Sequence, residues 1–376
     1  MTAVNSLGES ARRNATATRA LATSDAPVWG FADTHTHPFV DRAFGGKLFW
    51  GRPFGNLNTA FSDCGNAHPT QTLSAGTVLA GIALGGLLGP AVLALPVAGP
   101  VLTVSLSNLG NVGGALAFQD IQEFHPGTKG APTFQDWPRF DTKIHQLMYE
   151  SWLYRAYVGG LRLIVAHAVN NETICDALKG LGRTASGRTC DDMEAVTLQI
   201  QDARDMENFI NSECANGAPE LGCVGPGMGW FRVVTSSSEA RQAINRGQLA
   251  VVLGVEVDHL FGCGRAKTCV PQTIDTDLQA LIGLGVRHFF PIHLSDNPFG
   301  GMALYEDMFA ISSQYLNGTP VQAVECPVDA SDGAYTFQLT GFPQTATCNA
   351  QGLTDLGNYL LPQIAKQFDF KRNSCH

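Results

Sequence analysis

Two histidines separated by one residue, His35 and His37, follow a short apolar segment near the start of the chain. On a β-strand, residues at i and i+2 point to the same face, so both imidazoles can bind one metal ion. Neutral imidazole is a good ligand for zinc and other first-row divalent ions, and a strand fixes its direction. Pro38 would end the strand directly after this pair. The alternative is two ordinary surface histidines at a strand end. Further candidate ligands elsewhere in the chain distinguish the two interpretations.

Two later segments place a candidate ligand near the end of an apolar strand. Glu256 comes late in the apolar segment 249–257, and His293 comes late in 286–294. A carboxylate buried without a cation costs on the order of several kcal/mol, and a metal ion removes that cost. Each residue also has a simpler interpretation: Glu256 as the partner of a buried arginine, and His293 as a hydrogen-bonded core histidine. Three strand ends of the same kind favour one shared metal site.

The elements that must position these residues alternate between strand and helix. Five strands are expected, centred on residues 32, 165, 233, 253 and 290, and helices are expected from about residue 191 and at 238–245, 277–284 and 353–367. Strands separated by helices predict parallel pairing with right-handed crossovers. No Gly-x-Gly-x-x-Gly motif supports the competing doubly wound sheet. The polar residues instead follow strand ends, which favours an α/β fold of the TIM-type (β/α)8 barrel kind, incomplete at about five of eight strands.

The domain organisation is predicted as a disordered tail at 1–27 followed by one partial barrel at 28–376. Two segments would interrupt the barrel: an apolar insertion at 64–119 without any Asp, Glu, Lys or Arg, and a long loop at 298–350. Part of the insertion, 77–104, is long and apolar enough for a membrane span, but three prolines interrupt it. We expect a lid, a helical hairpin or a contact with the membrane surface there, with a single membrane span as the alternative.

The charge of the chain argues against nucleic acid as a partner. The formal net charge is -9, and no block rich in Lys or Arg occurs. Phosphate binding needs clustered positive charge, so this class is set aside.

The cysteines suggest an oxidising compartment. Eight of the ten cysteines fall into couples that are close in sequence: Cys175 with Cys190, Cys214 with Cys223, Cys263 with Cys269, and Cys326 with Cys348. Such couples are typical of disulfides, which predicts an extracellular or periplasmic location. The N-terminal tail has no recognisable signal peptide, so free thiols in a cytoplasmic protein remain the alternative.

Three motifs follow one another in the second half of the chain. They are Val-Glu-Val-Asp-His at 255–259, the segment 284–293 that ends in Pro-Ile-His, and Gly-Leu-Thr-Asp-Leu-Gly at 352–357. In sequence and in order they resemble the motifs of the renal-type (membrane) dipeptidases of the metal-dependent amidohydrolase superfamily. The segments 136–138, 152–157 and 169–172 are more similar to a largely uncharacterised bacterial branch of that superfamily.

The resemblance implies a hydrolase of amide, peptide or ester bonds that uses a metal-activated hydroxide. Glu256 would bridge two zinc ions, and His35 and His37 would bind the more buried ion. His293 would hold the substrate carbonyl oxygen as negative charge develops on it. Asp33 is a candidate to orient a ligand histidine from outside the ligand set.

The sequence departs from the dipeptidase pattern in two ways. The first strand carries His-x-His where the dipeptidases have His-x-Asp, which argues against a dipeptide as the substrate. The family's remaining metal histidines and its acid/base aspartate would follow the 353–367 helix, beyond His376. The chain would then offer one half of a binuclear site, so a catalytically incomplete fragment, or a non-enzymatic protein that binds metal or a membrane surface, is the alternative.

The other histidines are expected to lie outside the site. His167 comes late in an apolar strand and is predicted to be a core or loop residue, with a position facing the pocket as the alternative. His288 has no supporting neighbours in the sequence. His259, beside Glu256, is a further candidate for a contact outside the ligand set.

Overall fold

The structure is a computed structural model. It describes residues 27–61, 146, 148–180, 184–217, 221–264, 267–302, 312–313, 316–318, 323–324, 337–338, 345–346, 348–349 and 354–367. Almost all of the predicted tail, the whole apolar insertion and most of the 298–350 loop lie outside these residues. Among the helices that are described, none is both long and apolar enough to cross a membrane.

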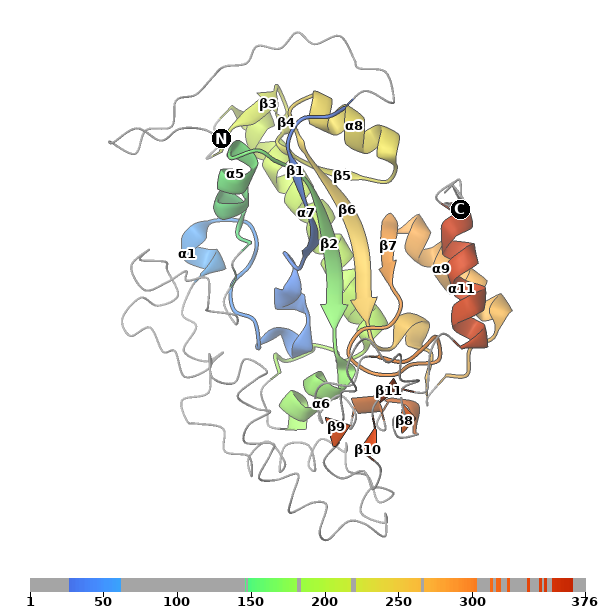
Figure 1. Cartoon of the computed structure of the whole chain (residues 1–376). Helices are drawn as coiled ribbons and strands as arrows, with labels where there is room; N and C mark the ends of the chain where they lie inside the picture. Colours follow the sequence, from blue (N-terminus) through green and yellow to red (C-terminus); the bar gives the residue numbers. More distant parts are fainter. Residues whose placement is uncertain are drawn as a thin grey trace.

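A five-stranded parallel sheet forms the centre of the described structure (Figure 1). Its strands are β1 (Phe31–Thr36), β2 (Leu161–Asn170), β5 (Phe231–Val234), β6 (Leu249–Val257) and β7 (Val286–Phe290). The sheet order is β1-β2-β6-β5, and β7 also pairs with β6. β5 pairs with the first half of β6, whereas β7 pairs with the second half. The five predicted strands and their parallel pairing are therefore confirmed, and closure into a barrel stays a prediction.

Helices and short elements surround this sheet (Figure 1). The α-helices are α1 (Leu57–Ala60), α5 (Glu150–Val158), α6 (Glu172–Gly180), α7 (Asp192–Asn216), α8 (Ser237–Asn245), α9 (Pro271–Gly283) and α11 (Asp355–Gln367). The 3-10 helices are η1 (Val40–Arg42), η2 (Phe44–Gly46) and η5 (Leu260–Gly262). Three small antiparallel pairs lie outside the main sheet: β3 (Cys223–Gly225) with β4 (Met228–Gly229), β8 (Ala323–Val324) with β11 (Cys348–Asn349), and β9 (Phe337–Gln338) with β10 (Thr345–Ala346).

The long helix α7 covers one face of the sheet. Asp191 caps its start by accepting a hydrogen bond from the backbone N–H of Glu194 at 2.7 Å. Its apolar face packs into a core with the side chains of β2 that point the same way, Ile164, Ala166 and Ala168. Because side chains alternate along a strand, His167 points to the opposite face. The helix thus fixes which face of β2 is left for the polar residues.

Two element boundaries differ from the prediction. The strand expected at 286–294 ends at Phe290, because Pro291 follows and lacks the N–H that continued pairing needs. His293 consequently lies in a loop. The helix expected at 277–284 begins earlier, at Pro271, since proline fits the first helical position well.

Disulfides form at three of the four predicted couples. They join Cys175 to Cys190, Cys214 to Cys223, and Cys263 to Cys269. Cys326, a member of the fourth couple, lies outside the described residues. The near-neighbour spacing was therefore a sound signal for pairing.

Candidate metal centre

The strand register brings side chains from different strands into rows on the face opposite α7. His167 of β2 and His288 of β7 both lie opposite Gly254, one on each side of β6. Glu256 follows two residues further along β6 and points to the same face as Gly254. The sheet thus places two imidazoles and a carboxylate together near the C-terminal end of its central strand.

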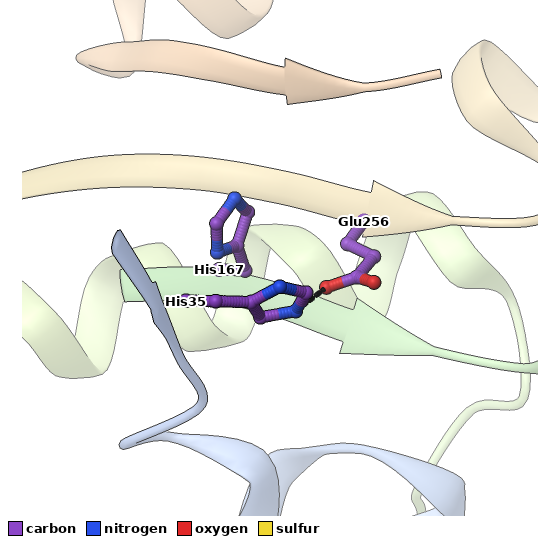
Figure 2. A group of neighbouring side chains, drawn as sticks. All are labelled: His35, His167 and Glu256. Atoms are coloured by element: carbon purple, nitrogen blue, oxygen red, sulfur yellow. Dashed lines mark hydrogen bonds and ion pairs between the residues drawn. The ribbon is translucent and has the colours of Figure 1, made fainter. Parts of the chain in front are cut away.

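One group of side chains on this face could hold a metal ion. His35 of β1, His167 of β2 and Glu256 of β6 each offer one ligand atom, and these atoms lie within 4.8 Å of one another. Figure 2 shows the His35 ring pointing at the Glu256 carboxylate, with the His167 ring beside it. His35 Nε2 lies 2.7 Å from Glu256 Oε2. The side chain of His35 is 51% exposed and that of Glu256 only 5%, so the group is open to solvent from the β1 side.

His37 stands next to this group. Its Nδ1 lies 3.1 Å from the backbone carbonyl oxygen of His167, and its Nε2 lies 3.5 Å from Glu256 Oε2. Burial lowers the pKa of His37, so the ring is neutral. A neutral ring that donates from Nδ1 keeps a lone pair on Nε2. A backbone carbonyl on the other ring nitrogen is also the usual outer contact of a metal-binding histidine.

His293 approaches Glu256 from the loop after β7. Its Nε2 lies 3.3 Å from Glu256 Oε1, and its Nδ1 lies 3.7 Å from Asp258 Oδ2. Burial lowers the pKa of His293, but the carboxylates of Asp258 and Glu256 outweigh burial, so the net shift is upward. The ring is therefore suited to donate hydrogen bonds at this edge of the sheet.

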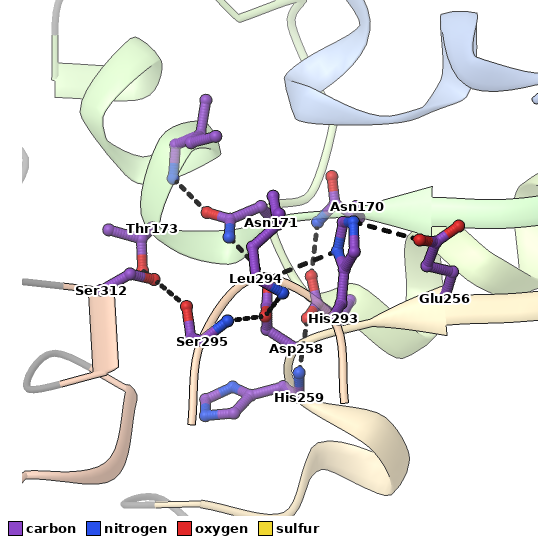
Figure 3. A network of polar contacts seen from close by, with 12 residues as sticks. Asn170, Asn171, Thr173, Glu256, Asp258, His259, His293, Leu294, Ser295 and Ser312 are labelled. Carbon is purple, nitrogen blue, oxygen red and sulfur yellow. Dashed lines mark hydrogen bonds and ion pairs between the residues drawn. The ribbon is translucent and has the colours of Figure 1, made fainter. Parts of the chain in front are cut away.

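Asp258 holds that loop in place through a buried network (Figure 3). Its Oδ1 accepts hydrogen bonds from the backbone N–H groups of Leu294 at 2.8 Å and Ser295 at 2.7 Å. Its Oδ2 accepts one from Asn171 Nδ2 at 2.6 Å. The two backbone donors directly follow His293, so the fully buried carboxylate of Asp258 fixes the loop beside that residue.

His167 and His288 form a pair that the sequence analysis had placed outside the site. His167 Nε2 lies 2.8 Å from His288 Nδ1. Burial lowers the pKa of His167 to about 3, and the neighbouring His288 adds to this shift. His167 is therefore neutral at physiological pH, as a metal ligand must be. His167 is buried in the sheet, as predicted, and it also belongs to the group that could hold a metal ion. His288, for which the sequence offers no supporting neighbour, contacts it.

The structure brings four of the predicted site residues together, namely His35, His37, Glu256 and His293. Sequence reasoning missed His167 and His288. Only the register of the strands brings these two residues together, and a single sequence does not specify that register. His-x-His and the strand-end carboxylate are local patterns, whereas the His167 and His288 contact is a property of pairing across β6.

Two predicted outer contacts lie elsewhere. Asp33 Oδ1 accepts a hydrogen bond from the backbone N–H of His35 at 3.1 Å, so Asp33 acts on the strand backbone and not on an imidazole. His259 Nδ1 lies 2.5 Å from Glu172 Oε2, and its Nε2 lies 3.2 Å from the carbonyl oxygen of Leu316. Its ring therefore turns away from Glu256 (Figure 3).

The donor set fits a first-row divalent ion. Imidazole nitrogens and a carboxylate oxygen are the ligands that zinc takes at sites that keep an open position. The Nδ1 atom of His167 is buried and has no hydrogen-bond partner among the residues that the structure describes. A buried polar atom left without a partner requires an explanation, and an ion is one that the neighbouring ligands support.

Comparison of the sequence with models of known protein families gives no match, and comparison with curated proteins gives no significant match. The fold and the site geometry therefore carry the functional argument. They show a parallel α/β sheet with a His/Glu group that could hold a metal ion.

Proposed function

We propose that this chain is a metal-dependent hydrolase that cleaves amide, peptide or ester bonds of small molecules. The observation that carries the proposal is the convergence of His35, His167 and Glu256 from three parallel strands. In (β/α) barrels the active site lies at the C-terminal ends of the strands, where Glu256 and His35 are found. The motifs similar to those of amidohydrolases also favour an incomplete (β/α)8 barrel of the amidohydrolase type as the fold of this chain.

The roles follow from the contacts of each residue. His35, His37, His167 and Glu256 would hold one or two ions, for which zinc is the best match to the donors. When bound, the metal supplies a Lewis acid and lowers the pKa of a coordinated water toward neutrality. His293 donates a hydrogen bond from Nε2 to the substrate carbonyl oxygen, because this atom already faces the cluster and the ring is held by the Asp258 loop.

The group of ligand residues is open to solvent beside β1. His35 is half exposed, and the exposed ring of Phe290 lies 6.3 Å from the His35 ring. An apolar group of a substrate can therefore pack on Phe290 while its polar bond reaches Glu256. A small amide, peptide or ester with an apolar group fits this arrangement.

Metal analysis of the full chain tests the proposal first. The wild-type protein, purified without chelator, should carry zinc or another divalent metal when measured by plasma mass spectrometry. His35→Ala and Glu256→Gln should lose most of it, because each removes one ligand. Glu194→Gln, an exposed carboxylate on α7, is the matched control and should keep the metal.

Hydrolysis is then measured on a panel of N-acyl amino acids, dipeptides and aryl esters. The proposal predicts turnover by the metal-loaded wild type, loss of turnover in Glu256→Gln, and wild-type turnover in Glu194→Gln. Equal and low metal content in all proteins would contradict the metal site. A loaded protein without turnover on the whole panel would contradict the hydrolase activity while leaving the metal site standing.

A further inference from the structure

The contact between His167 and His288 crosses the central strand of the sheet. The two residues lie on β2 and β7, and both are in register with Gly254 of β6. Their rings meet above that glycine at 2.8 Å, from Nε2 of His167 to Nδ1 of His288. A hydrogen bond that joins two strands over a third one fixes the His167 ring relative to the sheet.

Gly254 is the residue that makes this contact possible. A Cβ atom at this position would lie 2.6 Å from Cδ2 of His167 and 3.0 Å from its Nε2. The first distance is too short for two carbon atoms, so any larger residue would displace the His167 ring. The missing side chain at Gly254 therefore leaves the space that the rings of His167 and His288 need for their contact.

The two nitrogens of His167 have different surroundings. Nε2 faces His288, whereas Nδ1 is buried and has no hydrogen-bond partner among the described residues. A proton on Nδ1 would leave a buried N–H without an acceptor, which is costly. A proton on Nε2 instead satisfies the contact with His288 and leaves a lone pair on Nδ1.

We propose that His288 is a positioning residue that accepts a hydrogen bond from Nε2 of His167 and thereby holds the Nδ1 lone pair of His167 ready to bind the metal ion. The inference rests on the metal site of the proposed function and adds a residue to it. His288 itself is exposed, so its imidazole acts through His167 and is not needed as a ligand. Outer contacts of this kind fix both the tautomer and the direction of a ligand histidine.

Two variants at position 288 separate a hydrogen-bond role from a packing role. His288→Phe keeps a ring of similar size but removes the acceptor. His288→Asn is smaller and can place an amide oxygen near the position of Nδ1, so it restores the acceptor. Because residue 288 is exposed, both variants should fold, which the retained thermal unfolding transition of each will show.

The first measurement is the affinity of the metal-free full chain for Co²⁺, followed by the visible absorption of the bound ion. We expect affinity to fall about 10- to 100-fold in His288→Phe and to stay within about threefold of the wild type in His288→Asn. Equal affinity of His288→Phe and wild type would overturn the inference, although the proposed function would stand.

The second measurement reads the tautomer of His167 without any metal. Long-range ¹H–¹⁵N spectra of the ¹⁵N-histidine-labelled full chain, assigned with His167→Asn, should show Nε2 protonated and Nδ1 bare in the wild type. His288→Phe should lose this fixed tautomer. A proton on Nδ1 of the wild type would overturn the inference even if the chain binds Co²⁺. A wild type that binds no Co²⁺ would instead contradict the proposed function, and the tautomer would still decide the role of His288.

Discussion

Glu256 is the residue at which the contacts of the site meet. Its two carboxylate oxygens face imidazoles on both sides: His35 and His37 at Oε2, and His293 at Oε1. A buried carboxylate is unfavourable alone, and here it is stabilised by the same groups that would share an ion with it. The position of each imidazole therefore matters as much as its presence.

Asp258 controls one of these positions, and its replacement should destabilise the loop that carries His293. Asp258→Asn keeps one oxygen for the backbone N–H groups of Leu294 and Ser295 but turns an amide toward Asn171, which is also a donor. Loss of a hydrogen bond to a buried charged group predicts about 2 to 3 kcal/mol less free energy of unfolding, measured by urea denaturation of the oxidised protein. Asp191→Asn, a change between two good helix caps, should cost less than about 0.5 kcal/mol. Equal effects of the two changes would contradict the role of Asp258.

Asp41 in η1 should lower stability at high pH. Burial raises the pKa of its carboxyl to about 7, and nearby Asp202 adds to the shift, although Arg42 opposes it. Between about pH 4 and pH 7, the carboxyl is protonated in the folded state and ionised in the unfolded state. The free energy of unfolding therefore falls as the pH rises through this range. Above about pH 7 the full cost of burying the ionised carboxylate is present. Asp41→Asn removes this cost.

We therefore expect Asp41→Asn to stabilise the protein at pH 8, and to do so by about 1 to 3 kcal/mol more than at pH 5, in paired urea denaturation curves. A larger gain at pH 5 than at pH 8 would have the opposite sign and would contradict the raised pKa.

At the scale of elements, most of the strands of the central sheet could be predicted from the apolar segments of the sequence. The strands β2 and β6 could be predicted because their buried runs of Val, Ile, Leu and Ala are bounded by glycine or polar residues. β1 has no buried run of this kind, and it was predicted from the apolar segment before it and from the spacing of His35 and His37. His293 lies in a loop because Pro291 ends the strand before it. The proline is visible in the sequence, but the apolar character of the segment 286–294 led to the prediction of a longer strand. The pairing of β6 with β2, β5 and β7 was not predictable, because the sequence of a strand does not specify which other strands pair with it.

Gly254 shows the consequence of that pairing. Gly254→Ala adds one methyl group, which would meet the His167 ring at 2.6 Å in a buried sheet. We expect a loss of about 1 to 3 kcal/mol in the free energy of unfolding, as for other overpacked cores, together with weaker metal binding. Gly283→Ala, at the end of α9, would meet nothing within 4 Å and is the control that should leave both properties unchanged. A Gly254→Ala protein with wild-type stability and metal content would contradict the described packing.

At the scale of the whole molecule, a metal ion would link parts of the chain that are far apart in sequence. His35 and Glu256 are separated by 221 positions, yet their side chains lie 2.7 Å apart. An ion bound by residues of β1, β2 and β6 stabilises the folded chain only, because the unfolded chain does not bring these ligands together.

Saturating zinc should consequently raise the melting temperature of the metal-free protein by about 5 °C, measured by calorimetry. Glu194→Gln should show the same rise, and Glu256→Gln should show little or none. A rise of equal size in Glu256→Gln would place the stabilising ion elsewhere.

The most direct test of the metal centre is a crystal structure of the full chain grown with zinc, with diffraction data collected on both sides of the zinc absorption edge. We predict an anomalous difference peak within bonding distance of His35, His167 and Glu256, with Nδ1 as the ligand atom of His167. No peak among these three side chains, or rings of His35 and His167 that point away from Glu256, would contradict the account.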